Sequence, residues 1–153
     1  MSEFIIFVGL QGAGKSTWYR EHFAMTHALV SKDLLPKQQK QLRQMQLLTE
    51  YLAAGQSVVV DNTNPTIADR APLIAIGHTY GATLIAYYFD VPFALCLQRN
   101  RQRSGLARVP DIALYALNKR FTAPTSAEGF DQVLRVTLDA DGTAVSQLVD
   151  FSV

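Results

Sequence analysis

Residues 9–17 read GLQGAGKST and match the pattern G-x-x-x-x-G-K-[ST]. The apolar run FIIFV at 4–8 precedes them, and a helix is expected over 14–23. In a strand-to-helix turn of this kind, glycine allows the backbone N–H groups to surround phosphate oxygens. The lysine then lies near the β- and γ-phosphates, and the serine hydroxyl can ligate Mg²⁺. The stretch predicts a nucleoside triphosphate site on a solvated loop, made by Gly9, Gln11, Gly12, Ala13, Gly14, Lys15, Ser16 and Thr17.

Short apolar runs alternate with helical patterns along the rest of the chain. Further strands are expected at 28–30, 58–60, 83–89 and 133–138, and helices at 37–54, from 64, after 92 to about 103, and at 111–120. Asn64 is expected to cap the helix that begins there, the third of the chain, with Pro65 in its first turn, and Pro72 should kink it. The turn Asp141-Gly142 predicts that 145–149 pairs back as an antiparallel edge. The order predicts an α/β fold, a three-layer sandwich around a parallel sheet of five strands.

Length and composition exclude several classes of protein. A chain of 153 residues predicts one domain over 1–153, and 48% hydrophobic against 18% charged residues excludes disorder of the whole chain. Fourteen Lys and Arg against 13 Asp and Glu argue against binding through bulk positive charge. The single Cys96 cannot form an internal disulfide, and neither a secretory signal nor a membrane-spanning stretch is visible. These features predict a cytoplasmic protein with no membrane partner.

The charges are unevenly distributed along the chain. Residues 99–120 hold six Lys and Arg against Asp111, a net charge of +5. Residues 121–153 hold Arg135 against five acids, a net charge of −4. A solvated helix face followed by an acidic tail would account for this pattern. A basic surface beside the predicted phosphate site would account for it as well.

Two acids follow buried strands and are candidates for the reaction itself. In an open parallel sheet the strand ends meet at one crevice, so Asp33 after 28–30 and Asp61 after 58–60 should face the phosphate loop. Asp61 has the pattern of an acid that assists the metal, although it could instead cap the following turn. Asp33 could accept the proton of an acceptor hydroxyl, although it could instead cap the next helix.

Five segments carry a resemblance to a known family. They appear in the order GLQGAGKSTWYR at 9–20, SKD at 31–33, VDNTNP at 60–65, DVP at 90–92 and RNRQR at 99–103. The set resembles the 5′-hydroxyl kinase domain of polynucleotide kinases, within the wider group of P-loop kinases, over about residues 4–120. The resemblance implies strand order 2-3-1-4-5, a lid around 103–111, and transfer of the γ-phosphoryl of ATP to a hydroxyl with Mg²⁺.

The resemblance also implies roles for particular residues. Asp33 corresponds to the general base, Arg103 to a lid arginine at the transferring phosphoryl, and Lys15 to the catalytic lysine of the loop. Asp61 would support the metal together with Ser16, and Arg99 would flank adenine. The family has an arginine three positions after its catalytic aspartate that holds an acceptor phosphate. That position here is Pro36, and the adjacent Lys37 is not a bidentate donor.

Three functions therefore remain open from the sequence. The first is a kinase of polynucleotide 5′-hydroxyl ends, which the DNTNP block favours. The second is a kinase of a small metabolite such as a nucleoside or a sugar, including zeta-toxin-like kinases, which Pro36 favours. The third is an ATP-binding regulatory module without catalysis, against which the presence of both Asp33 and Arg103 argues. The oligomeric state is not predicted by any pattern in the chain.

Overall fold

A six-stranded sheet with the order β2-β3-β1-β4-β5-β6 organises the fold in a computed structural model that describes residues 2–152, with only the backbone of Leu106. The two end residues of the predicted domain 1–153 lie outside this range. The strands are β1 (Glu3–Val8), β2 (Ala28–Val30), β3 (Val58–Val60), β4 (Thr83–Phe89), β5 (Gln132–Leu138) and β6 (Ala144–Phe151). Strands β1 to β5 pair in parallel and β6 pairs antiparallel to β5, which confirms the predicted order and the antiparallel edge.

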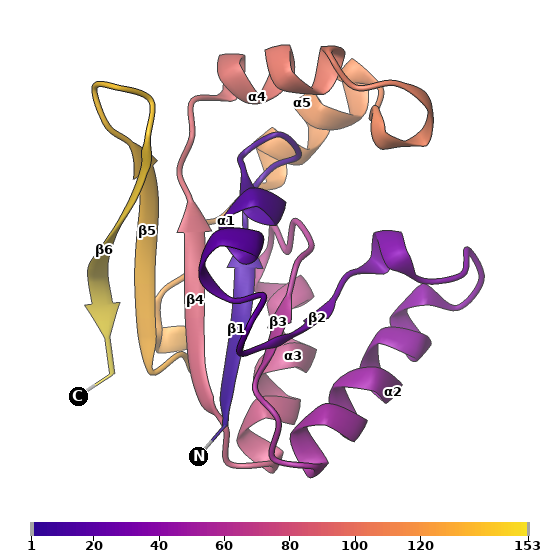
Figure 1. Ribbon diagram of the computed structural model, residues 1–153, viewed down its shortest axis with the longest axis vertical. Coiled ribbons are helices and arrows are strands. Elements are labelled where there is room, and N and C mark those ends of the chain that lie inside the picture. Colours follow the sequence, from indigo (N-terminus) through magenta and orange to yellow (C-terminus); the bar gives the residue numbers. More distant parts are fainter. Residues whose placement is uncertain (1, 153) are drawn as a thin grey trace.

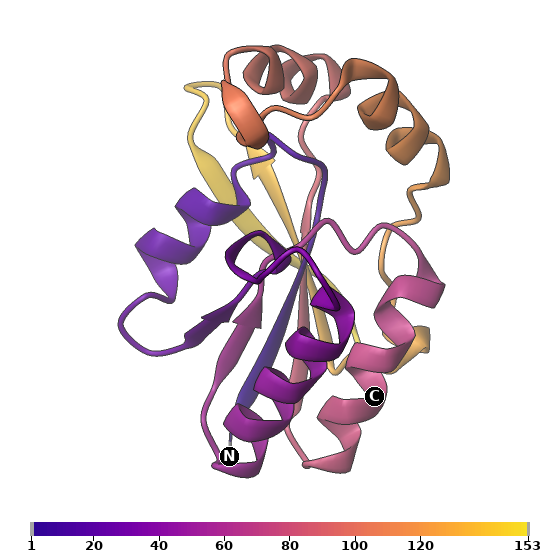
Figure 2. The same cartoon turned by 90° about the vertical axis from the view of Figure 1, so that its right-hand side faces the viewer.

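The helices form layers on both faces of this sheet (Figures 1 and 2). They are α1 (Lys15–His22), α2 (Lys40–Ala53), α3 (Ile67–Thr79), α4 (Phe93–Arg101) and α5 (Asp111–Arg120), with short 3-10 turns η1 (Lys32–Leu34), η2 (Gly105–Ala107) and η3 (Ser126–Glu128). Figure 2 shows α1 on one side of the sheet and α2 and α3 on the other, with α4 and α5 beyond the carboxyl ends of the strands. Within residues 2–152, none of these helices has the length and apolar character needed to span a bilayer.

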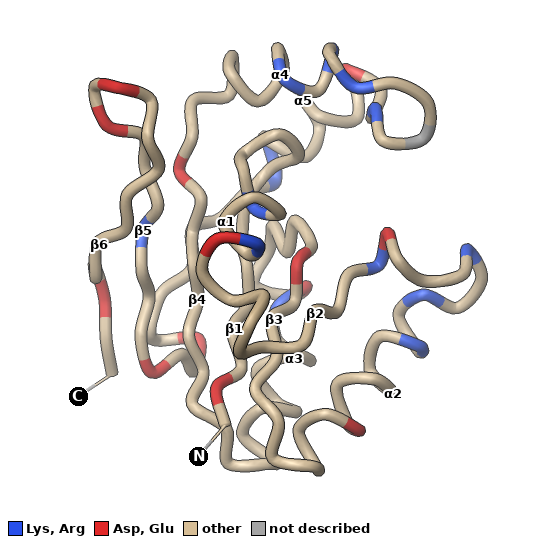
Figure 3. The backbone as a smooth tube through the Cα atoms, in the orientation of Figure 1, with Lys and Arg blue, Asp and Glu red and all other residues tan. Residues whose placement is uncertain are grey.

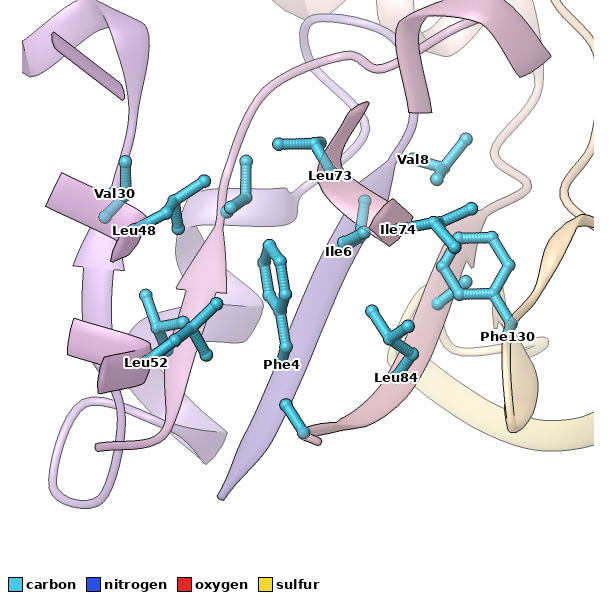
Figure 4. Packing of buried hydrophobic residues seen from close by; sticks show 14 of the residues in the cluster. Phe4, Ile6, Val8, Val30, Leu48, Leu52, Leu73, Ile74, Leu84 and Phe130 are labelled. Atoms are coloured by element: carbon cyan, nitrogen blue, oxygen red, sulfur yellow. The ribbon is translucent and has the colours of Figure 1, made fainter. Parts of the chain in front are cut away.

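Strand β1 contributes to both layers of the core, because its successive side chains point to opposite faces. Phe4, Ile6 and Val8 pack with Leu48 and Leu73 of the two helices on one face (Figure 4). The alternate residues of β1 pack on the other face with Trp18, Cys96 and Leu114, from α1, α4 and α5. Burial on both faces explains why the strand reads as a continuous apolar run. It also fixes the phosphate loop at the carboxyl end of a rigid central strand.

The predicted start of the third helix was wrong. Helix α3 begins at Ile67, and the Thr66 hydroxyl caps it by accepting from the backbone N–H of Asp69 at 3.1 Å. Asn64 instead takes a left-handed conformation with φ 44°, and its Nδ2 donates to the Phe7 carbonyl at 2.8 Å. The tertiary bond to β1 therefore outweighs the local preference of asparagine for a helix cap. Pro72 lies inside α3, which continues past it to Thr79.

Candidate active site

Two glycines of the phosphate loop are required by their surroundings. Gly12 has φ 83°, and a Cβ on it would lie 2.8 Å from the Cys96 carbonyl oxygen. A Cβ on Gly9 would lie 2.9 Å from Cβ of Phe89 on the neighbouring strand. Gly14, with φ 94°, is the left-handed residue immediately before α1. The loop therefore packs closely against β4 and α4 while its backbone turns into the helix.

The other loop residues take different places. Ala13 is buried in the core, and its N–H donates to the Leu10 carbonyl at 3.2 Å. Thr17 is exposed, and its hydroxyl accepts from Arg20 at 3.2 Å. Gln11 lines the main cavity, and its Oε1 is buried without a hydrogen-bond partner among the described residues. A buried acceptor of this kind is costly unless a further donor reaches it.

Lys15 is less solvated than the sequence predicted. The side chain is half-buried, and Nζ donates to the carbonyls of Gly9 at 2.9 Å and Leu10 at 2.8 Å. Burial lowers the pKa of its ammonium from 10.5 to about 8, against the attraction of Asp61, which raises it. The group is therefore a cation at neutral pH, held over the loop by bonds that a phosphate oxygen could replace.

Ser16 and Asp61 meet at the start of α1. The Ser16 hydroxyl donates to Oδ2 of the buried Asp61 at 2.8 Å, which joins the carboxyl end of β3 to the phosphate loop. Within residues 2–152 no group of three His, Cys, Asp or Glu side chains could hold a metal ion. One hydroxyl and one carboxylate fit Mg²⁺, which usually takes few protein ligands and completes its shell with water and substrate phosphates.

Asp33 lies in η1, exposed at the carboxyl end of β2. A chain of hydrogen bonds from α2 and from the loop after β3 fixes this turn. The buried Gln44 of α2 accepts from Asn62 Nδ2 at 2.6 Å, and Asn62 Oδ1 accepts from the backbone N–H of Lys32 at 2.9 Å. Ser31 also accepts from the backbone N–H of Asp33, at 3.4 Å. Asp33 is thus placed by neighbours that leave its carboxylate without a hydrogen-bond partner among the described residues.

Helix α4 ends at Arg101, two residues before the predicted end near 103. Arg99 donates from NH1 to the Gly12 carbonyl at 3.0 Å, so this arginine is attached to the phosphate loop. Arg103 follows in a turn closed by its N–H to the Asn100 carbonyl at 3.1 Å. The buried Asn100 side chain donates to the Val109 carbonyl at 2.6 Å and accepts from its N–H at 3.0 Å. These bonds hold the two ends of residues 100–109 together while Arg103 stays exposed.

Two cavities meet at the phosphate loop. The larger, about 500 Å³, is lined by the loop, by Asp33 and Asp61, and by Arg103. The second, about 420 Å³, lies between the loop, Arg99 and the β5–β6 turn at 142–144. Arg103 lines both cavities, which places it where they join. Figure 3 shows Lys and Arg gathered along α4, α5 and the loop between them, and on the start of α2, on either side of this region.

The sheet order, the phosphate loop and the strand-end acids define an α/β fold of the P-loop nucleotide-binding type. Residues 4–124 match the family described as "AAA domain", and the chain belongs to that family. It is 30% identical over 138 residues to a bifunctional polynucleotide phosphatase/kinase of Schizosaccharomyces pombe. That match covers 88% of this chain and 33% of the relative. A putative bifunctional polynucleotide phosphatase/kinase of Acanthamoeba polyphaga mimivirus is 28% identical, over 91% of this chain and 34% of that protein.

The chain spans about a third of the length of these relatives. Among solved structures, a fungal RNA kinase superposes with a TM-score of 0.67 at 15% identity, over 89% of this chain and 38% of that one. A gluconokinase from Sinorhizobium meliloti superposes with a TM-score of 0.61 at 17% identity, over 88% of this chain and 82% of that one. Both structures share the fold, and their acceptors differ in chemistry.

Proposed function

We propose that the chain transfers the γ-phosphoryl of ATP to the 5′-hydroxyl end of a polynucleotide. The observation that carries the proposal is the shared cavity, in which the phosphate loop, Asp33 and Arg103 line one space of about 500 Å³. A base for the acceptor and cations for the donor are thereby available to the same reacting atoms. The names of the two relatives support the nucleic-acid acceptor, and the fungal RNA kinase fold is consistent with it.

In this proposal each residue has one task. Asp33 accepts the proton of the acceptor hydroxyl as its oxygen bonds to the γ-phosphorus, and the bond from that phosphorus to the bridging oxygen breaks to release ADP. Lys15 and the loop amides bind the phosphates, and Arg103 offsets charge that develops on the transferred group. Ser16 and Asp61 would hold Mg²⁺, which neutralises phosphate charge when bound. The second cavity, with Arg99, would receive the base and ribose.

A small metabolite is the competing acceptor. The gluconokinase fold and the proline at position 36 favour it, because no arginine follows Asp33 at that spacing. A neutral sugar would need the same base and phosphate loop, so the reaction centre alone fits both acceptors. The polynucleotide acceptor is preferred because the two relatives with polynucleotide kinase names are 30% and 28% identical to the chain, whereas the gluconokinase is 17% identical.

The test is a panel of acceptors with radiolabelled ATP and Mg²⁺. We expect label on a 5′-hydroxyl oligonucleotide and none on gluconate or on an oligonucleotide with a 5′-phosphate. Asp33→Asn should lower that transfer by roughly 10²- to 10⁴-fold while ATP binding is kept. Glu50→Gln, at an exposed acid near the far end of α2, is the matched control and should leave the rate unchanged. Labelled gluconate would refute the polynucleotide assignment, and ATP binding without any transfer would indicate a regulatory module.

A further inference from the structure

The turn that carries Asp33 has little packing of its own. None of the residues of η1 is buried, and its one large apolar side chain, Leu34, is 70% exposed. Hydrogen bonds to neighbouring elements must therefore hold the turn in place. A reacting group that is misplaced by about 1 Å can cost roughly 10²-fold in rate, so the bonds that hold this turn bear directly on the reaction.

The loop after β3 joins this turn to the phosphate loop. The Asp61 N–H donates to the Val30 carbonyl at 2.9 Å, and Asn62 Oδ1 accepts from the Lys32 N–H at 2.9 Å. The Asp61 carboxylate meanwhile accepts from the Ser16 hydroxyl at 2.8 Å. Two adjacent residues thus contact both the turn and the phosphate loop, and the orientation of Asn62 sets where the turn lies.

The amide of Gln44 fixes the orientation of Asn62. Because a backbone N–H can only donate, Asn62 must turn Oδ1 toward Lys32 and Nδ2 toward Gln44, which accepts through Oε1 at 2.6 Å. Gln44 is 2% exposed and follows the same face of α2 as the buried Leu48 and Leu52, at spacings of four. The acceptor is therefore mounted on a helix that is packed rigidly in the core.

A buried glutamine at this position is not explained by packing. Glutamine is mostly exposed in proteins, and burying an amide costs free energy that only its hydrogen bonds offset. A leucine would continue the apolar face that Leu48 begins. The bond to Asn62 is the feature that the amide adds, and that bond leads to the turn of Asp33.

We propose that Gln44 is a positioning residue for phosphoryl transfer and acts on Asp33 through Asn62. This inference rests on the proposed function, in which Asp33 is the base. Gln44 orients the Asn62 side chain, Asn62 holds the backbone of the turn, and the turn places the carboxylate in the cavity that the phosphate loop also lines. Gln44 takes no part in the proton transfer itself.

The experiment is a double-mutant cycle between Gln44 and Asp33, measured as single-turnover transfer from labelled ATP to the acceptor that wild type uses. Gln44→Met keeps the length of the side chain and removes the amide. It should lower the rate by about 10- to 100-fold, while the Kd for ATP changes by less than about twofold. In the Asp33→Asn background the same substitution should lower the remaining rate by less than about twofold, because the group that it positions is gone.

Two further variants separate positioning from damage to the core. Gln46→Met is the matched control, since Gln46 is exposed on the same helix and lines neither cavity, and it should keep the wild-type rate. Gln44→Glu keeps an oxygen that accepts from Asn62 in either protonation state, so it should recover part of the rate. Gln44→Leu serves the same cycle where Gln44→Met does not fold, and thermal melts set the assay temperature below every midpoint.

The outcomes separate the two proposals. If Gln44→Met lowers the rate equally in wild type and in Asp33→Asn, or not at all, the positioning role is wrong and the proposed function stands. If wild type phosphorylates a sugar and no oligonucleotide, the proposed acceptor is wrong, and the cycle with that sugar decides the role of Gln44. If Asp33→Asn keeps the wild-type rate, or wild type phosphorylates no acceptor, both proposals are wrong.

Discussion

Arg103 offers the sharpest test of the reaction centre. Replacing it with alanine should lower kcat by about 10²- to 10³-fold, which corresponds to about 2.7–4 kcal/mol of transition-state stabilisation. The reason is its place at the junction of the two cavities, where the transferred phosphoryl would lie. Charge on that group is greatest in the transition state, so KM for ATP should change by less than about threefold.

The expected loss of kcat in Arg103→Ala can be distinguished from damage to the fold. Arg103 is exposed, and its side chain has no hydrogen bond or ion pair with any described residue, so its removal breaks no such bond. The two ends of residues 100–109 stay joined through Asn100 and Val109. Arg103→Lys keeps the charge and loses the planar fork, and should cost about 10- to 30-fold in kcat. Neither variant should shift the melting temperature.

Arg101→Ala is the matched control for Arg103. Arg101 lies two residues earlier, pairs with Asp111 at 2.9 Å and lines neither cavity, so kcat should be unchanged. The assay is steady-state and single-turnover transfer from labelled ATP to a 5′-hydroxyl oligonucleotide. The reasoning is refuted if Arg103→Lys retains wild-type kcat. It is also refuted if Arg103→Ala acts on KM for ATP as strongly as on kcat, because the arginine would then bind ground and transition states alike.

Two further predictions concern titration and stability. Lys15 has a pKa lowered to about 8, and phosphate binding favours its ammonium, so the Kd for ATP measured by calorimetry should rise as pH increases above about 8. Lys15→Arg should remove that dependence, and a Kd for wild type that is flat to about pH 9.5 would contradict it. Arg70→Met should lower the free energy of unfolding by about 3–5 kcal/mol, because it leaves the buried Glu128 unpaired. Arg135→Met, at the exposed pair with Asp90, should cost under about 1 kcal/mol in the same denaturant titration.

The lowered pKa of Lys15 also makes the free energy of unfolding depend on pH. Between about pH 8 and 10.5 the unfolded chain binds more protons at this residue than the native one. The contribution of Lys15 to the free energy of unfolding therefore rises with pH across this window. Affinity for ATP and stability should respond to this one group in opposite directions, which separates its titration from general alkaline unfolding.

The features predicted correctly from the sequence are those with a local cause. The apolar run 4–8 reads as a strand because both of its faces are buried, and the spacing of GLQGAGKST fixes a turn into a helix. Parallel strands then bring Asp33 and Asp61 to one edge, and both line the larger cavity with the phosphate loop. These local patterns, together with the rule that parallel strands end at one edge of the sheet, account for the relative positions of the phosphate loop, Asp33 and Asp61.

The features that were missed depend on contacts between distant segments. Gln44 reads as the polar side of an amphipathic helix, yet it is buried and binds Asn62. Nothing in the sequence distinguishes Gln44 from the other glutamines of the same stretch. Asn64 is of a residue type that often caps helices, but its side chain instead donates a hydrogen bond to the carbonyl of Phe7 in β1, 57 positions earlier in the sequence. Lys15 is half-buried because its own loop folds around it. No pattern within a window of the sequence encodes these partners.

The acidic and the basic segments of the chain have different roles in the structure. Several acids of 121–152 accept backbone hydrogen bonds: Asp131 from Leu84 at 2.8 Å, Asp139 from Thr143 at 3.0 Å, and Asp150 from Ser126 at 2.6 Å. The bond from Ser126 lowers the pKa of Asp150, as expected for a carboxylate that accepts from the backbone.

By contrast, Arg103 and Arg120 of the basic segment 99–120 line the cavity and have no described partner. The acids are thus used to close turns and sheet edges, and these cations remain available for phosphate. A polynucleotide that contacts them should release counterions, so its KM should rise steeply with salt, whereas a neutral sugar would lack this dependence. The near-neutral net charge of the chain is therefore compatible with the proposed anionic acceptor, because the unpaired cations are concentrated at one edge of the sheet.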